Sequence, residues 1–183
     1  MTGTTLADSA ALCDRAAVAV RVAAALVTRS AVAQRSRLRV DGPAHPAVAD
    51  EGVVLLSQSV TAVRVGAVRQ LVKCVARNSG LAVSDQADFV LAVQELVTNA
   101  IRHGGGRGRL VLRLAGDCLV CSVTDTGAGF AGLPAAGSGP PPAGREGGRG
   151  LFLIRQLTQS AEIINGATGC TVTITMLLPS AAS

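Results

Sequence analysis

From residue 53 onward, apolar residues recur at two different spacings, and each spacing predicts one kind of element. The apolar run Val53–Gln58 is typical of a strand. From Ser59 to Asn78 the apolar residues stand three and four positions apart, as they do on one face of an amphipathic helix. The sequence Asn-Ser-Gly at residues 78–80 is a typical helix end. The pattern therefore predicts one strand followed by one helix.

A second helix is predicted to end at His103, where the three glycines Gly104–Gly106 follow. Ser84 is placed to cap its N-terminus. Asp85 and Asp88 fall in its first turn, where the positive end of the helix dipole favours acidic side chains.

Two hairpins and one more helix complete the predicted order. Residues 109–114 and 118–125 form the first hairpin around a turn at 115–117, and residues 161–165 and 170–179 form the second. Between the hairpins lie a loop rich in glycine and proline at 126–149 and a helix at 150–159. Helices that cover one face of a mainly antiparallel sheet form an α+β two-layer sandwich, which is the predicted fold class.

Length and composition predict one domain with an extension. A chain of 183 residues suits one well-buried domain, here residues 51–179, with an Ala/Arg-rich N-terminal extension and linker at 1–50 and a tail at 180–183. No uncharged apolar stretch is long enough to span a membrane. Arg15 and Arg21 interrupt the apolar N-terminal region, unlike a secretory signal, so a cytoplasmic protein is expected.

The net charge of +5 comes with no Trp, no Tyr and three Phe. Single-stranded nucleic acid is usually bound on aromatic side chains, so direct nucleic-acid binding is not expected. The charge is explained by a solvated basic surface or by one that meets an acidic protein partner. Cys118 and Cys121 fall three apart in a predicted strand and so point to opposite faces, which predicts buried small side chains rather than a shared metal site.

Four polar residues interrupt the otherwise apolar segment 89–101 of the second helix. At 100° per residue, Gln94, Glu95, Thr98 and Asn99 lie at about 0°, 100°, 40° and 140°, so they form one polar stripe. Burying a carboxylate and an amide is costly without partners, which favours a functional site. An ordinary amphipathic helix with a narrow wet face remains the alternative for this helix alone.

Two glycine-containing segments add further candidate chemistry. Asp125, at the end of a predicted strand, is followed by Gly127 and Gly129, so a carboxylate acceptor stands beside backbone that a planar base can approach. Residues 147–150 read Gly-Gly-Arg-Gly and lead into a helix, whose N-terminal N–H groups and dipole suit phosphate. Neither a Walker A loop nor a dinucleotide fingerprint is present. Taken singly, each segment is also typical of an ordinary turn or loop.

In this order and at these distances, the three segments resemble the motifs of the GHKL ATPase superfamily. ELVTNAIRHG (95–104) looks like its N box, DTGAGF (125–130) like its first glycine box and GGRGLFLI (147–154) like its second. The chain is most similar to the anti-sigma-factor serine/threonine kinases, over roughly residues 53–179. This resemblance implies the Bergerat form of the α+β sandwich, with ATP and Mg²⁺ as cofactors.

The resemblance implies a role for two polar residues of the helix, Asn99 and Glu95. Asn99 would hold Mg²⁺ and through it the phosphates, because an amide oxygen suits a hard cation. Glu95, one turn earlier on the same face, would be the general base that orients the attacking hydroxyl. His103, one turn beyond Asn99, fits a place near the phosphates and a role as a helix-terminal cation equally well.

The resemblance also implies how the nucleotide is held. Asp125 would accept a hydrogen bond from the adenine amino group, Gly127 and Gly129 would line the base, and Thr171 would add a hydrogen bond near it.

At the other end of the nucleotide, Gly148 and Gly150 would wrap the phosphates as the lid closes. Arg149, or Arg145 in the loop, would meet the phosphate charge.

Two functions follow as hypotheses. The first is an anti-sigma factor serine/threonine protein kinase, which binds a sigma factor and transfers the γ-phosphoryl group of ATP to a Ser or Thr of an anti-sigma antagonist protein. The second is a non-catalytic ATP-binding regulatory module that acts by nucleotide-dependent protein binding. Glu95 favours the first, since a pure binding module needs no base there. Whether the chain forms a homodimer is left open.

Overall fold

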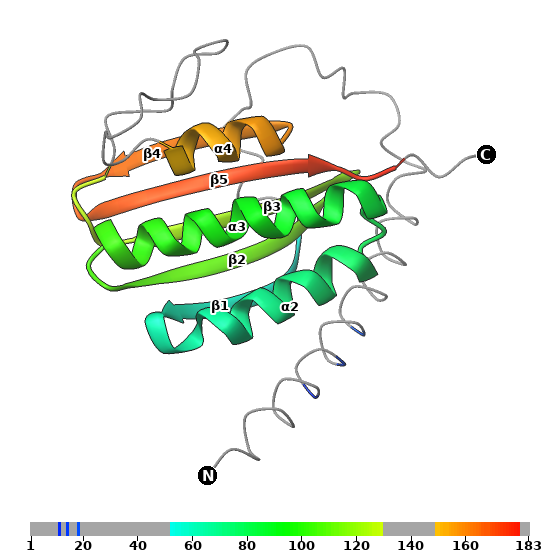
Figure 1. The fold of residues 1–183 in the computed structure, drawn as a ribbon, viewed down its shortest axis with the longest axis horizontal. Coiled ribbons are helices and arrows are strands. Elements are labelled where there is room, and N and C mark those ends of the chain that lie inside the picture. Colours follow the sequence, from blue (N-terminus) through cyan, green and yellow to red (C-terminus); the bar gives the residue numbers. More distant parts are fainter. Residues whose placement is uncertain (1–10, 12–13, 15–17, 19–51, 130–148, 180–183) are drawn as a thin grey trace.

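The computed structural model describes residues 52–129 and 149–179, together with Ala11, Asp14 and Val18. These residues form a five-stranded antiparallel sheet in the order β1-β2-β3-β5-β4, with a layer of helices on one face (Figure 1). The strands are β1 (Val53–Thr61), β2 (Arg107–Ala115), β3 (Cys118–Asp125), β4 (Ser160–Gly166) and β5 (Gly169–Leu177). The helices are α2 (Val65–Asn78), α3 (Val83–His103) and α4 (Arg149–Leu157), and a 3₁₀ turn, η2 (Ala62–Arg64), precedes α2. The predicted α+β two-layer class is confirmed.

The core lies between the helices and the sheet, and α3 is its central element. Figure 1 shows α3 running along the sheet between α2 and α4. Phe89 and Leu96 of α3 are fully buried, as are Leu112 of β2, Leu119 of β3 and Ile154 of α4. Burying each such side chain contributes about 1.5–3 kcal/mol to folding. The position of α3 is therefore fixed from both sides and from below.

The first strand is longer than the pattern predicted, so the prediction of a helix starting at Ser59 is wrong. β1 continues to Thr61, and α2 begins only at Val65. Ser59 and Val60 pair with Arg109 and Gly108 of β2, and Val60 is fully buried. Pairing satisfies backbone groups that a helix would have satisfied internally, so the sheet contact outweighs the helical spacing of the apolar residues.

The end of α2 follows the prediction. Gly80 has a φ of 81°, and its N–H donates to the Arg77 carbonyl at 3.2 Å. The N–H of Leu81 donates to the Ala76 carbonyl at 3.2 Å, and Leu81 is buried. This is the Schellman arrangement, in which glycine adopts a left-handed conformation and a following apolar residue anchors the chain.

The predicted cap of α3 is wrong. The helix begins at Val83 with Ala82 as the N-cap residue, and Ser84 lies inside the first turn. The Ser84 hydroxyl donates instead to the Asp85 carboxylate at 2.7 Å. The side chain of Gln86 donates to the Leu81 carbonyl at 2.9 Å. The burial of Leu81 and the hydrogen bond from Gln86 fix the path of the chain into α3, so the helix starts before Ser84.

The two cysteines of β3 lie in different surroundings. Cys121 is fully buried in the core, whereas Cys118 is half-buried outside it. Burial raises the pKa of both thiols, and the nearby Asp117 carboxylate raises the pKa of Cys118 further.

Within the described part of the chain, no helix combines the length and hydropathy that crossing a membrane requires.

Candidate functional site

Four segments distant in the sequence meet at one end of the sandwich. They are the C-terminus of α3, the end of β3, the N-terminus of α4 and the turn between β4 and β5, at the left of Figure 1. Asp125, the last residue of β3, lies opposite Gly108 of β2 and Cys170 of β5. This end holds Glu95, Asn99 and Asp125 together with the glycines that follow the strand.

Asp125 is a buried carboxylate that the backbone holds at one oxygen. Only 7% of the residue is exposed. Its Oδ1 accepts a hydrogen bond from the backbone N–H of Gly127 at 2.9 Å. The arrangement fixes the orientation of the carboxylate, a group whose oxygens accept hydrogen bonds from donors such as an exocyclic amine.

Three glycines allow the backbone to pack closely around Asp125. A Cβ atom on Gly104 would collide with the Asp125 side chain, and one on Gly169 would collide with the Asp125 carbonyl. A Cβ atom on Gly127 would collide with the carbonyl of His103. The three backbone segments therefore approach to a distance that only glycine permits.

The side chains of Glu95 and Asn99 lie under the first turn of α4. Both residues are half-buried and stand one helical turn apart on the same side of α3. A Cβ atom on Gly150 would lie 2.8 Å from Glu95 Oε2 and 3.4 Å from Asn99 Nδ2. Gly150 thus brings the N-terminus of α4 against the carboxylate and the amide, and the absence of a side chain leaves room between them.

The remaining candidate residues take different positions. Gly129 has a φ of 79°, and a Cβ atom there would collide with the Asn165 amide of β4. The Thr171 hydroxyl lies 2.9 Å from the Thr124 hydroxyl. Since neighbouring residues of a strand point to opposite faces, the structure does not bring Thr171 to the side of the Asp125 carboxylate.

The position opposite Asp125 is occupied by Cys170, which is buried and was not singled out from the sequence. Side chains of a strand alternate between its two faces. Once the register of the hairpin is known, this alternation identifies Cys170 as a residue that faces the core.

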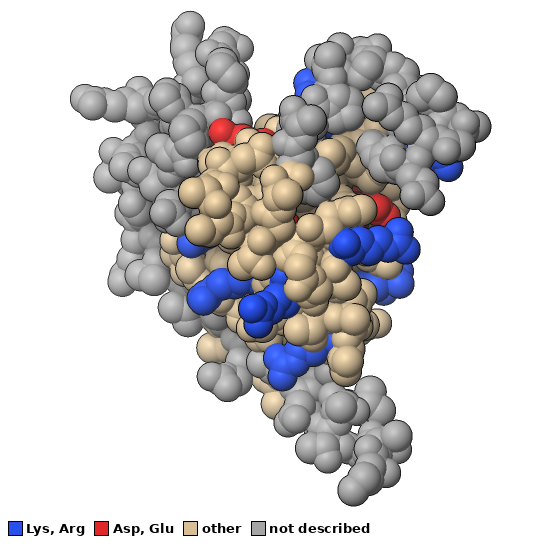
Figure 2. Space-filling model, turned by 90° about the vertical axis from the view of Figure 1, so that its left-hand side faces the viewer, with Lys and Arg blue, Asp and Glu red and all other residues tan. Residues whose placement is uncertain are grey.

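The cations near the site are exposed. Arg149 is the first residue of α4 and is exposed, while Arg102 and His103 are exposed in the last turn of α3. Figure 2 views the molecule from this end and shows several Lys and Arg side chains (blue) on its surface. A positively charged surface around a site lowers the electrostatic free energy of an anion bound there. Gly148 and Arg145, also predicted to meet phosphate, lie outside the described residues.

Three comparisons connect this geometry with known proteins. Residues 58–176 match the family model described as "Histidine kinase-like ATPase domain". The chain is 36% identical over 109 residues to the Serine-protein kinase RsbW of Halalkalibacterium halodurans, across 54% of this chain and 67% of that protein.

Among solved structures, the chain is similar to the RsbU and RsbW domains of Rv1364c from Mycobacterium tuberculosis, with 27% identity and a TM-score of 0.51. This match covers 67% of the chain but only 31% of that longer protein.

Proposed function

Because the chain belongs to the histidine kinase-like ATPase domain family, we propose that it is an anti-sigma factor serine/threonine kinase that uses ATP and Mg²⁺. One observation carries the proposal. A carboxylate and an amide, Glu95 and Asn99, lie one turn apart beneath Gly150, at the end of the sandwich that also holds the Asp125 carboxylate. A regulatory module without catalysis has no need of a base at position 95.

The residues present fit the nucleotide at both of its ends. At Asp125, Oδ1 is held by the N–H of Gly127, and the second carboxylate oxygen would accept a hydrogen bond from an adenine amino group. At Gly150 a side chain would fill the space over Glu95 and Asn99, and glycine leaves it open for phosphate. Mg²⁺ is commonly held by one or two protein oxygens together with phosphate oxygens and waters, which matches the Asn99 amide.

In this proposal each residue has a separate task. ATP would supply the γ-phosphoryl group, and Mg²⁺ would neutralise charge on the phosphates. Asn99 would hold the metal, and the exposed Arg149 would meet phosphate charge from the start of α4. Glu95 would orient the substrate hydroxyl and accept its proton. Glu95 lies on α3 and faces the first turn of α4, a position that would keep its carboxylate beside the substrate hydroxyl.

The partners are proposed from the resemblance to anti-sigma-factor kinases. A sigma factor would be bound, and a Ser or Thr of an anti-sigma antagonist would receive the phosphoryl group. The 36% identity to a protein named as a serine-protein kinase supports the choice of a hydroxyl acceptor.

The test compares two charge-removing substitutions on one helix. Glu95→Gln removes the proposed base, and Asp88→Asn removes an exposed carboxylate of the same helix. Each full-length protein is titrated with Mg-ATP by calorimetry and then incubated with radiolabelled ATP and each candidate antagonist encoded in the same genome. We expect native protein and Asp88→Asn to transfer phosphate, and Glu95→Gln to bind ATP without transfer.

The outcomes separate the two hypotheses. Binding of ATP without transfer by the native protein, to any candidate, would reject the kinase and favour the regulatory module. No binding of ATP would reject both.

A further inference from the structure

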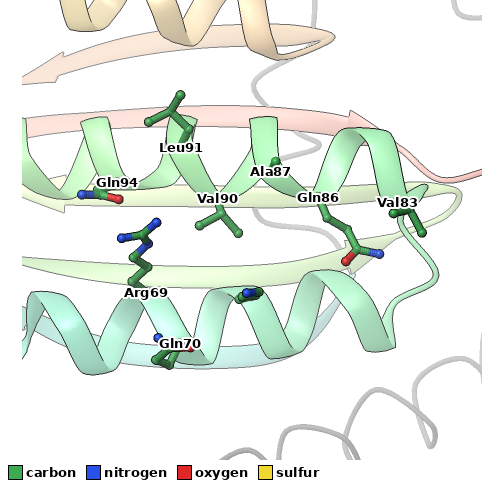
Figure 3. Close-up of a pocket in the computed structure, with 9 residues that line it drawn as sticks. Arg69, Gln70, Val83, Gln86, Ala87, Val90, Leu91 and Gln94 are labelled. Atoms are coloured by element: carbon green, nitrogen blue, oxygen red, sulfur yellow. The ribbon is translucent and has the colours of Figure 1, made fainter.

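A groove runs between α2 and α3, on the side of α3 away from α4 (Figure 3). Its volume is about 490 Å³. Arg69 and Lys73 of α2 line one wall, and Val83, Val90, Leu91 and Gln94 of α3 line the other. No residue assigned above to nucleotide binding lines it, so this surface is separate from the proposed ATP site.

One wall of the groove is apolar and accessible. Val83 is 86% exposed and Leu91 is 40% exposed, while Val90 between them is nearly buried. Figure 3 shows the Val90 side chain pointing from α3 toward α2. Large apolar side chains exposed beside a hollow are typical of a surface that a partner covers.

The other wall is cationic. Arg69 and Lys73 are exposed and stand four residues apart, so they lie one turn apart on the same side of α2. Figure 3 shows the Arg69 side chain reaching across toward α3. Within residues 52–129 and 149–179 neither cation has an ion-pair partner, and the acidic residues Asp85 and Asp88 of α3 do not line the groove.

We propose that this groove binds an acidic amphipathic helix of a partner protein. Two carboxylates one turn apart on that helix would pair with Arg69 and Lys73, and its apolar side chains would cover Val83 and Leu91. A third helix laid into the groove between two helices is a common mode of peptide recognition. The inference deepens the proposed function by giving the chemistry of a partner surface, and it rests on that function only for the existence of a partner.

The test uses a designed probe and charge reversals. The probe is a fluorescein-labelled 18-residue helical peptide with Glu pairs four residues apart beside a Leu face, and its control has Lys at each Glu position. Binding to the full-length protein is measured by fluorescence anisotropy without nucleotide. We expect the double substitution Arg69→Glu and Lys73→Glu to weaken binding of the acidic peptide by about tenfold or more, because two attractions become repulsions.

Matched controls separate this groove from general charge. Arg77→Glu changes an exposed cation of the same helix that does not line the groove, and should alter affinity by less than about twofold. Leu91→Ala should weaken binding by about threefold or more, since it removes the apolar anchor. The Lys-containing peptide should not bind.

Four results would overturn the proposal. They are no binding of the acidic peptide to the native protein, equal binding of the Lys peptide, an equal loss in Arg77→Glu, and an oligonucleotide of the same charge that binds with the same dependence on Arg69 and Lys73. ATP titration of the same samples keeps the two proposals apart, since ATP binding can fail while the peptide binds, and the reverse.

Discussion

The two sides of α3 present different chemistry although they share one helix. On the side of α4, Glu95 and Asn99 are half-buried beneath a glycine. On the side of α2, Gln94 lines an open groove whose other wall carries Arg69 and Lys73. Gln94 and Glu95 are neighbours in the sequence, yet the turn of about 100° between them separates a proposed reaction site from a proposed docking surface. A polar stripe on a helix is therefore divided by the helices packed beside it.

The largest expected effect comes from moving the carboxylate from one side to the other. In the double variant Gln94→Glu, Glu95→Gln, composition and net charge are unchanged, but the acid faces the groove. We expect phosphotransfer to fall by about 10²–10⁴-fold, as after loss of a general base, while ATP affinity changes little. Single-turnover transfer measures the first and calorimetry the second. Transfer at the native rate would show that the two sides are not distinct.

The next largest effect is expected from a substitution in the core, which supports both sides of α3. Phe89 is fully buried beneath α3, so Phe89→Ala should lower the free energy of unfolding by about 3–5 kcal/mol. Denaturant unfolding gives the value. Because α3 carries both surfaces, ATP binding and peptide binding should fail together near the midpoint of the transition. Loss of one while the other persists would contradict the shared support.

A smaller effect is expected from substitutions of two glycines, Gly150 of α4 and Gly66 of α2, which belong to the helices on either side of α3. A Cβ on Gly150 would lie 2.8 Å from Glu95 Oε2, so Gly150→Ala should weaken ATP binding by about tenfold. At Gly66 of α2 a Cβ would meet nothing within 4 Å, so Gly66→Ala should raise the free energy of unfolding by about 0.5–1 kcal/mol and leave ATP affinity unchanged. Calorimetry and urea unfolding of both variants measure the pair. An equal loss of ATP affinity in both would remove the link to Glu95.

The last effect depends on pH and tests the sheet that lies beneath both sides of α3. Burial raises the pKa of Cys121 above its ordinary value of 9.0, so the unfolded chain releases this proton at a lower pH than the native protein. The contribution of this thiol to the free energy of unfolding is complete below about pH 9. As the pH rises further, this contribution falls by about 1.4 kcal/mol per pH unit. Urea unfolding from pH 8 to 10 should show this extra slope in the native protein and not in Cys121→Ala. Parallel slopes would contradict it.

The order of elements followed from the sequence because each segment is long enough to show its period. The pattern failed where two elements meet. Val60 fits a helical spacing, yet it pairs with Gly108 of β2, and Val63, assigned to the same helical face, is 96% exposed. Ser84 has the chemistry of a cap, but a buried Leu81 sets the start of the helix earlier. Contacts distant in the sequence decide such boundaries.

The site was predictable to the extent that its motifs are local. Glu95 and Asn99 share a face because of helical spacing alone, and the structure places both beside Gly150. Which residue lies opposite Asp125 depends on the register of a hairpin, and a shift by one position exchanges Thr171 for Cys170. The α2–α3 groove depends on the distance between two helices, which no local pattern records.

The crowding around Asp125 has a consequence for variation at the three glycines packed there. Gly104 follows α3, Gly127 follows β3 and Gly169 is the first residue of β5. At each of them a single hydrogen atom occupies the space that any other residue would fill with carbon. A methyl group on Gly104 or Gly169 would push against the aspartate itself, and one on Gly127 would push against the His103 carbonyl and Gly104 beside it. In a saturation screen scored by ATP binding, these glycines should therefore be as intolerant as the aspartate itself.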